Sequence, residues 1–150
     1  MNPVNRLLVL IGLSLAAQLV SAQTVVKDAW VRGTVAQQKA TGAFMHITSA
    51  QGGKLVSAAS PAAGVVEIHQ MSMQGDMMKM NAVAGVELPA GKMVELKPGG
   101  YHIMLMDLKQ QAKPGDSIAL TLVIEGKDGK RETLAVSMPV KAVNTSEHKH

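Results

Sequence analysis

Short alternating runs of apolar and polar residues, separated by glycine and proline, are the feature that most restricts the fold of this chain. Alternation with a period of two is typical of β-strands with one buried face, whereas an amphipathic helix has a period of 3.6. The strands predicted in this way cover residues 25–32, 41–48, 54–60, 65–70, 77–83, 93–96, 102–108, 117–124 and 131–140. Glycine and proline turns lie between them. This spacing predicts an all-β, antiparallel Greek-key sandwich or small barrel.

The first 22 residues have the pattern of a cleavable signal peptide. Arg6 supplies a positive charge, residues 7–17 form an apolar run, and small residues at 20–22 precede a cleavage site before Gln23. The run is shorter than the about 20 apolar residues that a membrane-spanning helix needs. We therefore expect an exported, soluble mature protein without a transmembrane segment; the alternative is a retained N-terminal anchor.

The rest of the chain is long enough for one domain with its own core, which we expect over residues 23–140. Residues 141–150 lose the alternation, and we expect them to form a flexible tail. His148 and His150 in this tail are two residues apart, a spacing that can chelate Cu(II). A tail without function is the alternative.

The sequence has 11 methionines and no cysteine. Without cysteine there is no disulfide framework, so packing must hold the fold. A blue-copper electron-transfer site is also excluded, because its strong ligand is a cysteine thiolate. Methionine remains a usable soft ligand after export, because an oxidising compartment converts exposed thiols to disulfides but leaves thioethers able to bind metal.

Two histidines and two methionines form a neutral set of potential metal ligands: His69, Met80, His102 and Met104. Soft nitrogen and sulfur ligands favour Cu(I) over Zn(II), Mg(II) or Ca(II). His102 and Met104 are two residues apart in a predicted strand, so they would project from the same face. The same holds for His69 and Met71 if their strand continues that far, so the spacing does not choose between Met71 and Met80. Copper affinity should fall below about pH 6.5, where histidine takes up a proton.

This segment resembles the periplasmic copper chaperones called PCuAC. Their pattern is a His, ten residues, a Met, twenty-one residues and then His-x-Met, and the four potential ligands fit it without a gap. Residues 28–32, 41–45 and 114–116 extend the resemblance to nearly all of residues 23–140. The optional Met that follows the first His in the family is Gln70 in this sequence.

The resemblance implies a cupredoxin-like β-sandwich in the periplasm that binds one Cu(I) and carries copper for the assembly of cytochrome c oxidase. The implied partners are the copper-binding subunit of that oxidase or another copper chaperone, and we expect the carrier to be a monomer. Met71 and Met73 are candidates for auxiliary Cu(I) ligands. His148 and His150 are candidates for a second site that takes Cu(II).

Each candidate residue also has a simpler interpretation. His102 and Met104 could be inward-facing core residues, since methionine often fills gaps in cores, and His69 could be a hydrogen-bonded surface residue. His46 is not assigned to the metal. The extra methionines 71, 73, 77 and 78 could form a flexible apolar lip or act as transient ligands during copper entry. We expect Met93, Met106 and Met138 in the core.

Other functions fit the sequence less well. The formal net charge is +4, but the lysines are scattered and only three aromatic residues are present, which disfavours nucleic-acid binding. We expect no enzymatic activity, because no nucleophile and base arrangement or carboxylate motif is present. A plain adhesion module would leave the ligand spacing unexplained. The main alternative is a copper-sequestering protein for copper tolerance, which would bind several Cu(I) ions through the extra methionines.

Overall fold

The computed structural model describes residues 24–142, which form ten β-strands and no helix. The strands are β1 (Thr24–Arg32), β2 (Ala40–Ser49), β3 (Gly53–Ala59), β4 (Ala63–Gln74), β5 (Met77–Ala82), β6 (Val86–Leu88), β7 (Met93–Leu96), β8 (Tyr101–Leu108), β9 (Ser117–Gly126) and β10 (Arg131–Lys141). Nothing in this range is a helix that could cross a membrane. The predicted signal peptide, and His148 and His150 of the predicted tail, lie outside the described residues.

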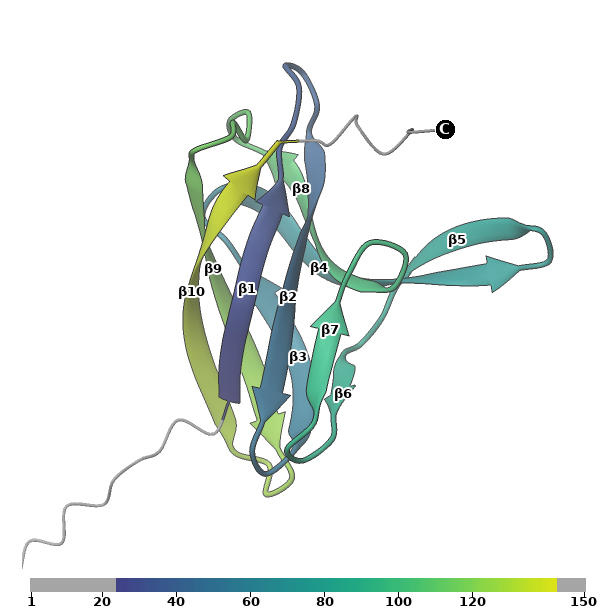
Figure 1. Ribbon diagram of the computed structural model, residues 1–150, viewed down its shortest axis with the longest axis vertical. Helices are drawn as coiled ribbons and strands as arrows, with labels where there is room; N and C mark the ends of the chain where they lie inside the picture. Colours follow the sequence, from purple (N-terminus) through teal and green to yellow (C-terminus); the bar gives the residue numbers. More distant parts are fainter. Residues whose placement is uncertain (1–23, 143–150) are drawn as a thin grey trace, which may run out of the picture.

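The strands form two packed layers that do not close into a barrel (Figure 1). One layer has the order β5, β4, β8, β2 and β1, with β7 also paired to β2, and the other has the order β10, β9, β3 and β6. The end strands β5 and β6 are not neighbours in this order, so the sheet stays open. The chain changes layer between β2 and β3 and again between β3 and β4, as Greek-key connections do. The all-β Greek-key prediction is confirmed.

One strand pair differs from the predicted antiparallel arrangement. β1 and β10 run parallel, with Val31 opposite Val140. Short turns force consecutive strands to pair antiparallel, but these two strands come from opposite ends of the sequence and no hairpin joins them. The apolar alternation carries no information on strand direction, so the prediction is wrong for this pair.

The core lies between the two layers and follows the alternation in the sequence. Every second residue of β9 from Ile118 to Ile124 is buried. From the opposite layer, Ile103 and Leu105 of β8 are fully buried. Each such side chain stabilises the fold by about 1.5–3 kcal/mol relative to an exposed one. Because neighbouring residues of a strand point to opposite faces, the residues that alternate with Ile103 and Leu105 project from the outer face of β8.

Of the three methionines predicted to lie in the core, one does so. Met138 is fully buried. Met93 is exposed, and Met106 is only partly buried and lies on the outer face of β8, since it alternates with Leu105. The prediction is wrong for Met93 and Met106, because a methionine in a strand does not by itself reveal which face is buried.

The strand pattern also differs from the prediction at β6 and at the end of β4. The three-residue strand β6 was not predicted, since it is too short for alternation to show. β4 continues to Gln74, beyond its predicted end at residue 70. Past Met71 it pairs with β5 alone and covers no core. Residues 71–74 (Met-Ser-Met-Gln) continue the alternation of apolar and polar residues, so the predicted end at residue 70 was too early. Gly75 begins the turn to β5 with φ of +63°, a conformation that glycine adopts easily.

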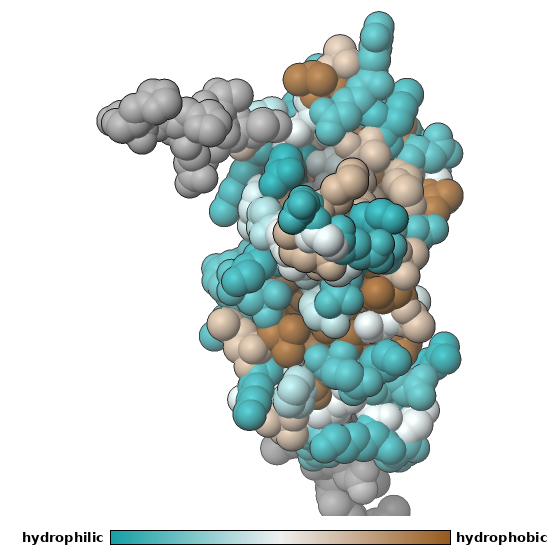
Figure 2. Space-filling view, turned by 90° about the vertical axis from the view of Figure 1, so that its right-hand side faces the viewer, coloured by the Kyte–Doolittle hydropathy of each residue, from teal (hydrophilic) through white to brown (hydrophobic). Residues whose placement is uncertain are grey.

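The end of β4 and the whole of β5 form a hairpin that projects sideways from the sandwich (Figure 1). We call it the methionine hairpin (residues 70–82). All six residues of β5 are exposed. Figure 2, turned so that this side faces the viewer, shows apolar residues scattered among hydrophilic ones. The hairpin is therefore an arm, attached to the sandwich where β4 pairs with β8.

Candidate metal centre

The two histidines of the predicted site lie side by side on the outer face of one layer. His69 of β4 and His102 of β8 are directly opposite in the antiparallel register, and their ring centroids are 5.7 Å apart. The residues are only 9% and 5% exposed, respectively. Their strand neighbours Ile68 and Ile103 point into the core instead. The interpretation of His102 as an inward-facing core residue is therefore wrong.

His102 is held in one tautomer by the backbone. Its Nδ1 lies 3.2 Å from the carbonyl oxygen of Gly100, and because a carbonyl can only accept, Nδ1 carries the proton. The other nitrogen, Nε2, then keeps its lone pair. Burial lowers the pKa of His102 below the ordinary 6.5, and the charges of His69 and Arg32 act in the same direction against the opposing Gly100 bond. The neutral, metal-binding form of His102 is thus favoured at neutral pH.

His69 is oriented by a carboxylate. Its Nε2 lies 2.7 Å from Oε2 of Glu67, so in the neutral ring Nε2 donates and Nδ1 has the lone pair. This Nδ1 is buried and has no hydrogen-bond partner among the described residues. A buried polar atom without a partner is unfavourable, and a bound metal ion would satisfy it. Carboxylate, imidazole and metal in this order form a common arrangement around metal-binding histidines.

Thioethers lie on the same face as the histidine pair. Met104 follows His102 at a spacing of two on β8, opposite Glu67 of β4. Met71, Met80, His102 and Met104 all line one open pocket with a volume of about 260 Å³, whereas His69 lies beside His102 and does not line it. Within residues 24–142, no group of three or more His, Asp or Glu side chains is placed to hold a metal ion. The arrangement therefore offers imidazole nitrogen and thioether sulfur together.

Met71 and Met80 remain equal candidates in the structure. They are direct cross-strand partners on β4 and β5, so both side chains lie on the face that carries His69. Met71 stands two residues after His69, while Met80 is its diagonal neighbour across the hairpin. Met73 lies one step farther out and does not line the pocket. The continuation of β4 is what brings Met71 to the site.

An aromatic wall closes one side of the pocket. Phe44 of β2 has its ring centroid 6.2 Å from that of His102 and 4.7 Å from that of Trp30. The Phe44 ring lies over Gly42, where an added Cβ would come within 2.9 Å of its Cζ atom. Gly42 therefore leaves the space that this ring occupies beside His102.

Two charged groups of opposite sign lie beside the site. The guanidinium of Arg32 lies 5.4 Å from the centre of the Phe44 ring, on the wall of the pocket. The carboxylate of Glu67 lies behind His69. Nothing among the potential ligands themselves carries a negative charge, so the site compensates a singly charged cation better than a doubly charged one.

His46 has a different environment, in agreement with its exclusion from the predicted ligand set. Its Nδ1 lies 3.2 Å from Asp28 and its Nε2 lies 3.4 Å from Glu95. Both ring nitrogens are thus engaged by carboxylates from β1 and β7. Because these carboxylates engage both of its nitrogens, His46 is a suitable control histidine.

Sequence reasoning missed Glu67, Gly42 and Phe44. Glu67 precedes His69 by two residues, so in a strand it shares a face with it, and this spacing could have revealed the contact. Phe44 and Gly42 come from a different strand. Their role depends on the register of β2 against β8, which no local pattern encodes.

Comparison with known sequences places most of the chain in one family. The family model described as "Putative lipoprotein LpqE-like" matches residues 24–140. A relative from Leifsonia xyli subsp. xyli, "Putative lipoprotein Lxx21020", is 36% identical over 119 residues, covering 77% of this chain and 68% of that protein. Another, "Uncharacterized protein RP573" of Rickettsia prowazekii, is 32% identical over 107 residues, covering 67% of this chain and 59% of the relative.

Comparison with solved structures finds PCuAC domains, as the sequence resemblance predicts. The Cu(I) form of DR1885 from Deinococcus radiodurans superimposes with a TM-score of 0.61 and 33% identity, covering 84% of this chain and 83% of that one. The copper-bound PCuAC domain from PmoF2 gives a TM-score of 0.65 at 20% identity, covering 81% of this chain and 94% of the other. The second likeness concerns the fold alone. The cupredoxin-like fold expected from the resemblance is confirmed.

Proposed function

The chain belongs to the LpqE-like family and has the PCuAC fold, and from this premise we propose that it is a periplasmic copper(I)-binding chaperone. It carries copper for the assembly of the copper sites of cytochrome c oxidase and delivers the ion by ligand exchange. Its proposed ligands are His69, Met80, His102 and Met104, with Met71 as an auxiliary.

The observation that carries this proposal is the pair of buried imidazoles beside thioethers. Each imidazole has one nitrogen engaged, by Glu67 or by the Gly100 carbonyl, which leaves the other with its lone pair. Binding of copper then needs no deprotonation, since thioethers and neutral imidazoles are ready ligands. A neutral, soft ligand set favours Cu(I) among the common metal ions.

The comparisons support copper as the cargo. The DR1885 structure at 33% identity is that of a Cu(I) form. The PCuAC domain of PmoF2 is also known with copper bound, although its likeness to this chain extends only to the fold. Copper chemistry in these proteins agrees with the donor atoms that this chain places on its outer face.

An open site suits a carrier. The pocket opens on the outer face of the sheet, and Met80 on its rim is 45% exposed. A partner could replace one ligand at a time, so the ion would pass over without release into water. Transfer of this kind makes and breaks only metal–ligand bonds, and we therefore propose a carrier without enzymatic activity.

The periplasmic location is part of the same proposal. The signal-peptide pattern of residues 1–22 and the lipoprotein names of the family and of the Leifsonia relative support export. Domain limits at residues 23–140, a monomeric state and a Cu(II) site at His148 and His150 also belong to the proposal. The acceptor is the copper-binding subunit of the oxidase or a second chaperone.

A copper-sequestering protein is the second candidate, and the exposed methionine hairpin is the observation that favours it. Such a protein would bind several Cu(I) ions with comparable affinity and keep them. A carrier would bind one ion tightly and give it up to its acceptor.

A transfer experiment tests the carrier function. The mature protein, residues 23–150, is loaded with one equivalent of Cu(I) without oxygen and mixed with the soluble copper domain of an oxidase subunit. Copper is then measured on each protein after separation. We expect most of the copper on the acceptor, whereas a loaded protein that keeps its copper would contradict the carrier function and favour sequestration.

A further inference from the structure

Methionine supplies all the large apolar side chains of the methionine hairpin. Residues 70–82 read QMSMQGDMMKMNA, with five methionines and no valine, leucine, isoleucine or aromatic residue. The core strand β9 uses isoleucine, leucine and valine for the same purpose. An arm that contacted a protein partner only through apolar surface would not require sulfur at each of these positions.

The register of the hairpin places four of the five methionines on one face. Met71 is opposite Met80, and Met73 is opposite Met78. Cβ atoms of direct cross-strand partners are about 4.5–5.5 Å apart. The second pair lies two residues farther along each strand, which is about 7 Å. The two pairs therefore form a ladder that continues outward from His69. Met77, opposite Gln74, lies on the other face.

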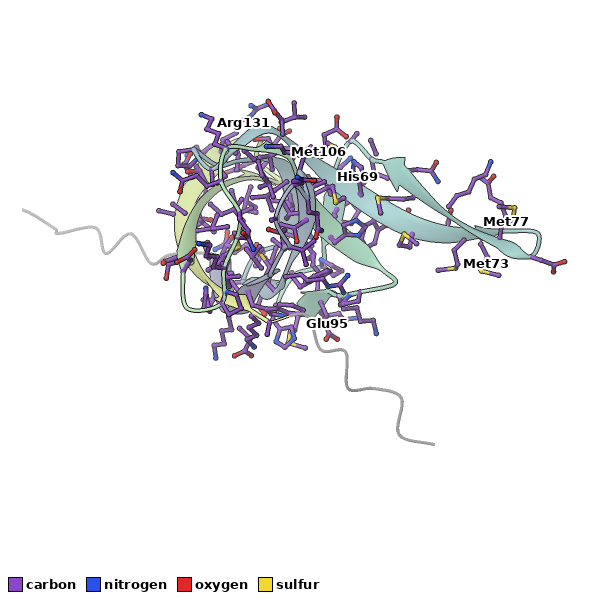
Figure 3. All side chains as sticks on the ribbon, turned by 90° about the horizontal axis from the view of Figure 1, so that it is seen from above. His69, Met73, Met77, Glu95, Met106 and Arg131 are labelled. Atoms are coloured by element: carbon purple, nitrogen blue, oxygen red, sulfur yellow. The ribbon has the colours of Figure 1, made fainter. Side chains whose placement is uncertain are left out.

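The outer pair of the ladder is exposed. Met73 is 61% exposed and Met78 is similarly open to solvent. Figure 3 shows His69 near the sandwich, at the base of the hairpin, and Met73 far out toward its tip. Apolar packing within residues 24–142 therefore does not explain these two side chains. Exposed apolar groups are unfavourable in water and commonly mark a binding function.

We propose that the hairpin holds a second Cu(I) ion, bound only by thioethers. Its ligands are Met73, Met78 and one sulfur of the Met71–Met80 pair. The site lies one ladder step outward from the histidine site. Thioether sulfur is neutral and soft, so it binds Cu(I) in preference to hard divalent ions. The identity of the metal rests on the proposed function.

The inner pair connects the two sites. Met71 and Met80 line the pocket of His102 and also neighbour Met73 and Met78 along their strands. A copper ion can therefore move from the outer site to the inner one by exchanging one sulfur at a time. The outer site has no imidazole and faces solvent, so it binds the ion more weakly than the inner site. It acts as a loading position, whereas a storage protein would hold its ions with comparable affinity.

The test follows the methionine methyl groups of the mature protein by NMR during an anaerobic titration with Cu(I). The first equivalent is expected to move the signal of Met104. The second equivalent should move the signals of Met73 and Met78. Met77 is the matched control, because it lies on the opposite face of the same hairpin and is 67% exposed. Its signal should stay in place.

Substitutions with leucine complete the test, because leucine has a similar volume but no sulfur. Met73→Leu together with Met78→Leu should abolish the second equivalent and leave the first unchanged, whereas Met77→Leu should leave both unchanged. The proposal is overturned if the wild type takes up no second equivalent, or if the double variant still binds it.

The variant His102→Ala separates this inference from the proposed function. It should lose the tight first equivalent but still show the Cu(I)-dependent shift of Met73 and Met78. If the wild type has no tight first site that depends on His102, the proposed function fails while the thioether site stands. If the His102-dependent site is present and the Met73 and Met78 signals do not respond, only the thioether site fails.

Discussion

Two regions of one ladder of paired strands present their donor atoms in opposite ways. The base is the histidine pair His69 and His102, where the methionine hairpin joins the sandwich, and the tip is the outer methionine pair Met73 and Met78. At the base, His69 and His102 are buried, and Glu67 or a backbone carbonyl holds one nitrogen of each ring. At the tip, Met73 and Met78 project into solvent. Fixed ligands lose little freedom when they bind a metal, whereas exposed ones exchange easily. The base therefore retains the ion and the tip exchanges it.

The largest effect should come from removing a ligand at the base. We expect His102→Ala to weaken tight Cu(I) binding by more than about 100-fold. Loss of a group that only hydrogen-bonds to a metal ligand already commonly weakens metal binding about 10- to 100-fold. Competition with a Cu(I) chelator under anaerobic conditions measures this change. His46→Ala is the matched control and should bind as the wild type does, because both nitrogens of His46 contact carboxylates. Equal losses of Cu(I) affinity in the two variants would contradict the assignment of His102 as a ligand.

A smaller effect on Cu(I) affinity should follow from removing the carboxylate that orients His69, because all the ligands stay in place. Glu67→Ala removes the partner of Nε2 of His69 and should weaken Cu(I) binding about 10-fold or more. Glu67→Gln keeps an acceptor oxygen and should recover part of the loss. If Glu67→Ala binds Cu(I) like the wild type in the same competition assay, the carboxylate does not position the ring.

Substitutions of Met71 and Met80 show which of these two cross-strand partners belongs to the histidine site. Met80→Leu should weaken the first Cu(I) equivalent by about tenfold, or roughly 1.4 kcal/mol, and Met71→Leu should weaken it less. The same chelator titration measures both variants. The reverse order would show that Met71 is the ligand and that Met80 is the auxiliary.

The pH dependence of Cu(I) binding should reflect the burial of His102. Because burial lowers its pKa below 6.5, protons compete with copper for Nε2 only at lower pH than they would for a free imidazole. We expect constant affinity above pH 6.5 and a decrease as the pH falls through the lowered pKa, by at most about tenfold per pH unit for this one proton. Titrations between pH 7.5 and 5.0 measure it. A decrease of about tenfold per pH unit that already begins above pH 6.5 would be inconsistent with this environment.

The same shift has a consequence for the metal-free protein. Between pH 6.5 and the lowered pKa, the unfolded chain binds a proton at His102 that the folded chain does not bind. The free energy of unfolding should therefore fall as the pH decreases through this range and level off below it. Urea unfolding at several pH values tests this contribution, and the slope should be reduced in His102→Ala.

The smallest effect concerns the tip. Met73→Leu together with Met78→Leu should change the free energy of unfolding by less than about 0.5 kcal/mol, since the side chains are exposed and support no core. Urea unfolding of the metal-free variant measures this difference. A loss of several kcal/mol would mean that the methionines are structural.

The alternation of residues was enough to predict the sandwich because the core uses it directly, as β8 and β9 illustrate. Ile103 and Leu105 reveal one face of β8, and with it the outward direction of His102. The pattern could not predict that β1 and β10 run parallel. The relative direction of two strands from opposite ends of the sequence depends on contacts between distant segments, which apolar periodicity does not encode.

The candidate site was likewise predicted from the sequence only in part. The spacing of the histidines and methionines, together with the family pattern, named the residues that the fold places on one face. It could not name Phe44 or Gly42, which reach the site from β2 through long-range register. Nor could it decide between Met71 and Met80, because the hairpin makes them direct partners and gives both access to the pocket.

X-ray absorption spectroscopy of the mature protein with one equivalent of Cu(I) shows whether the two histidines bind the ion, because it counts the nitrogen and sulfur atoms around the metal. We expect two imidazole nitrogens and two thioether sulfurs per copper, with the imidazole contribution halved or lost in His102→Ala. A copper ion surrounded by sulfur alone in the wild type would contradict the histidine site, since the methionines of the hairpin would then hold the ion.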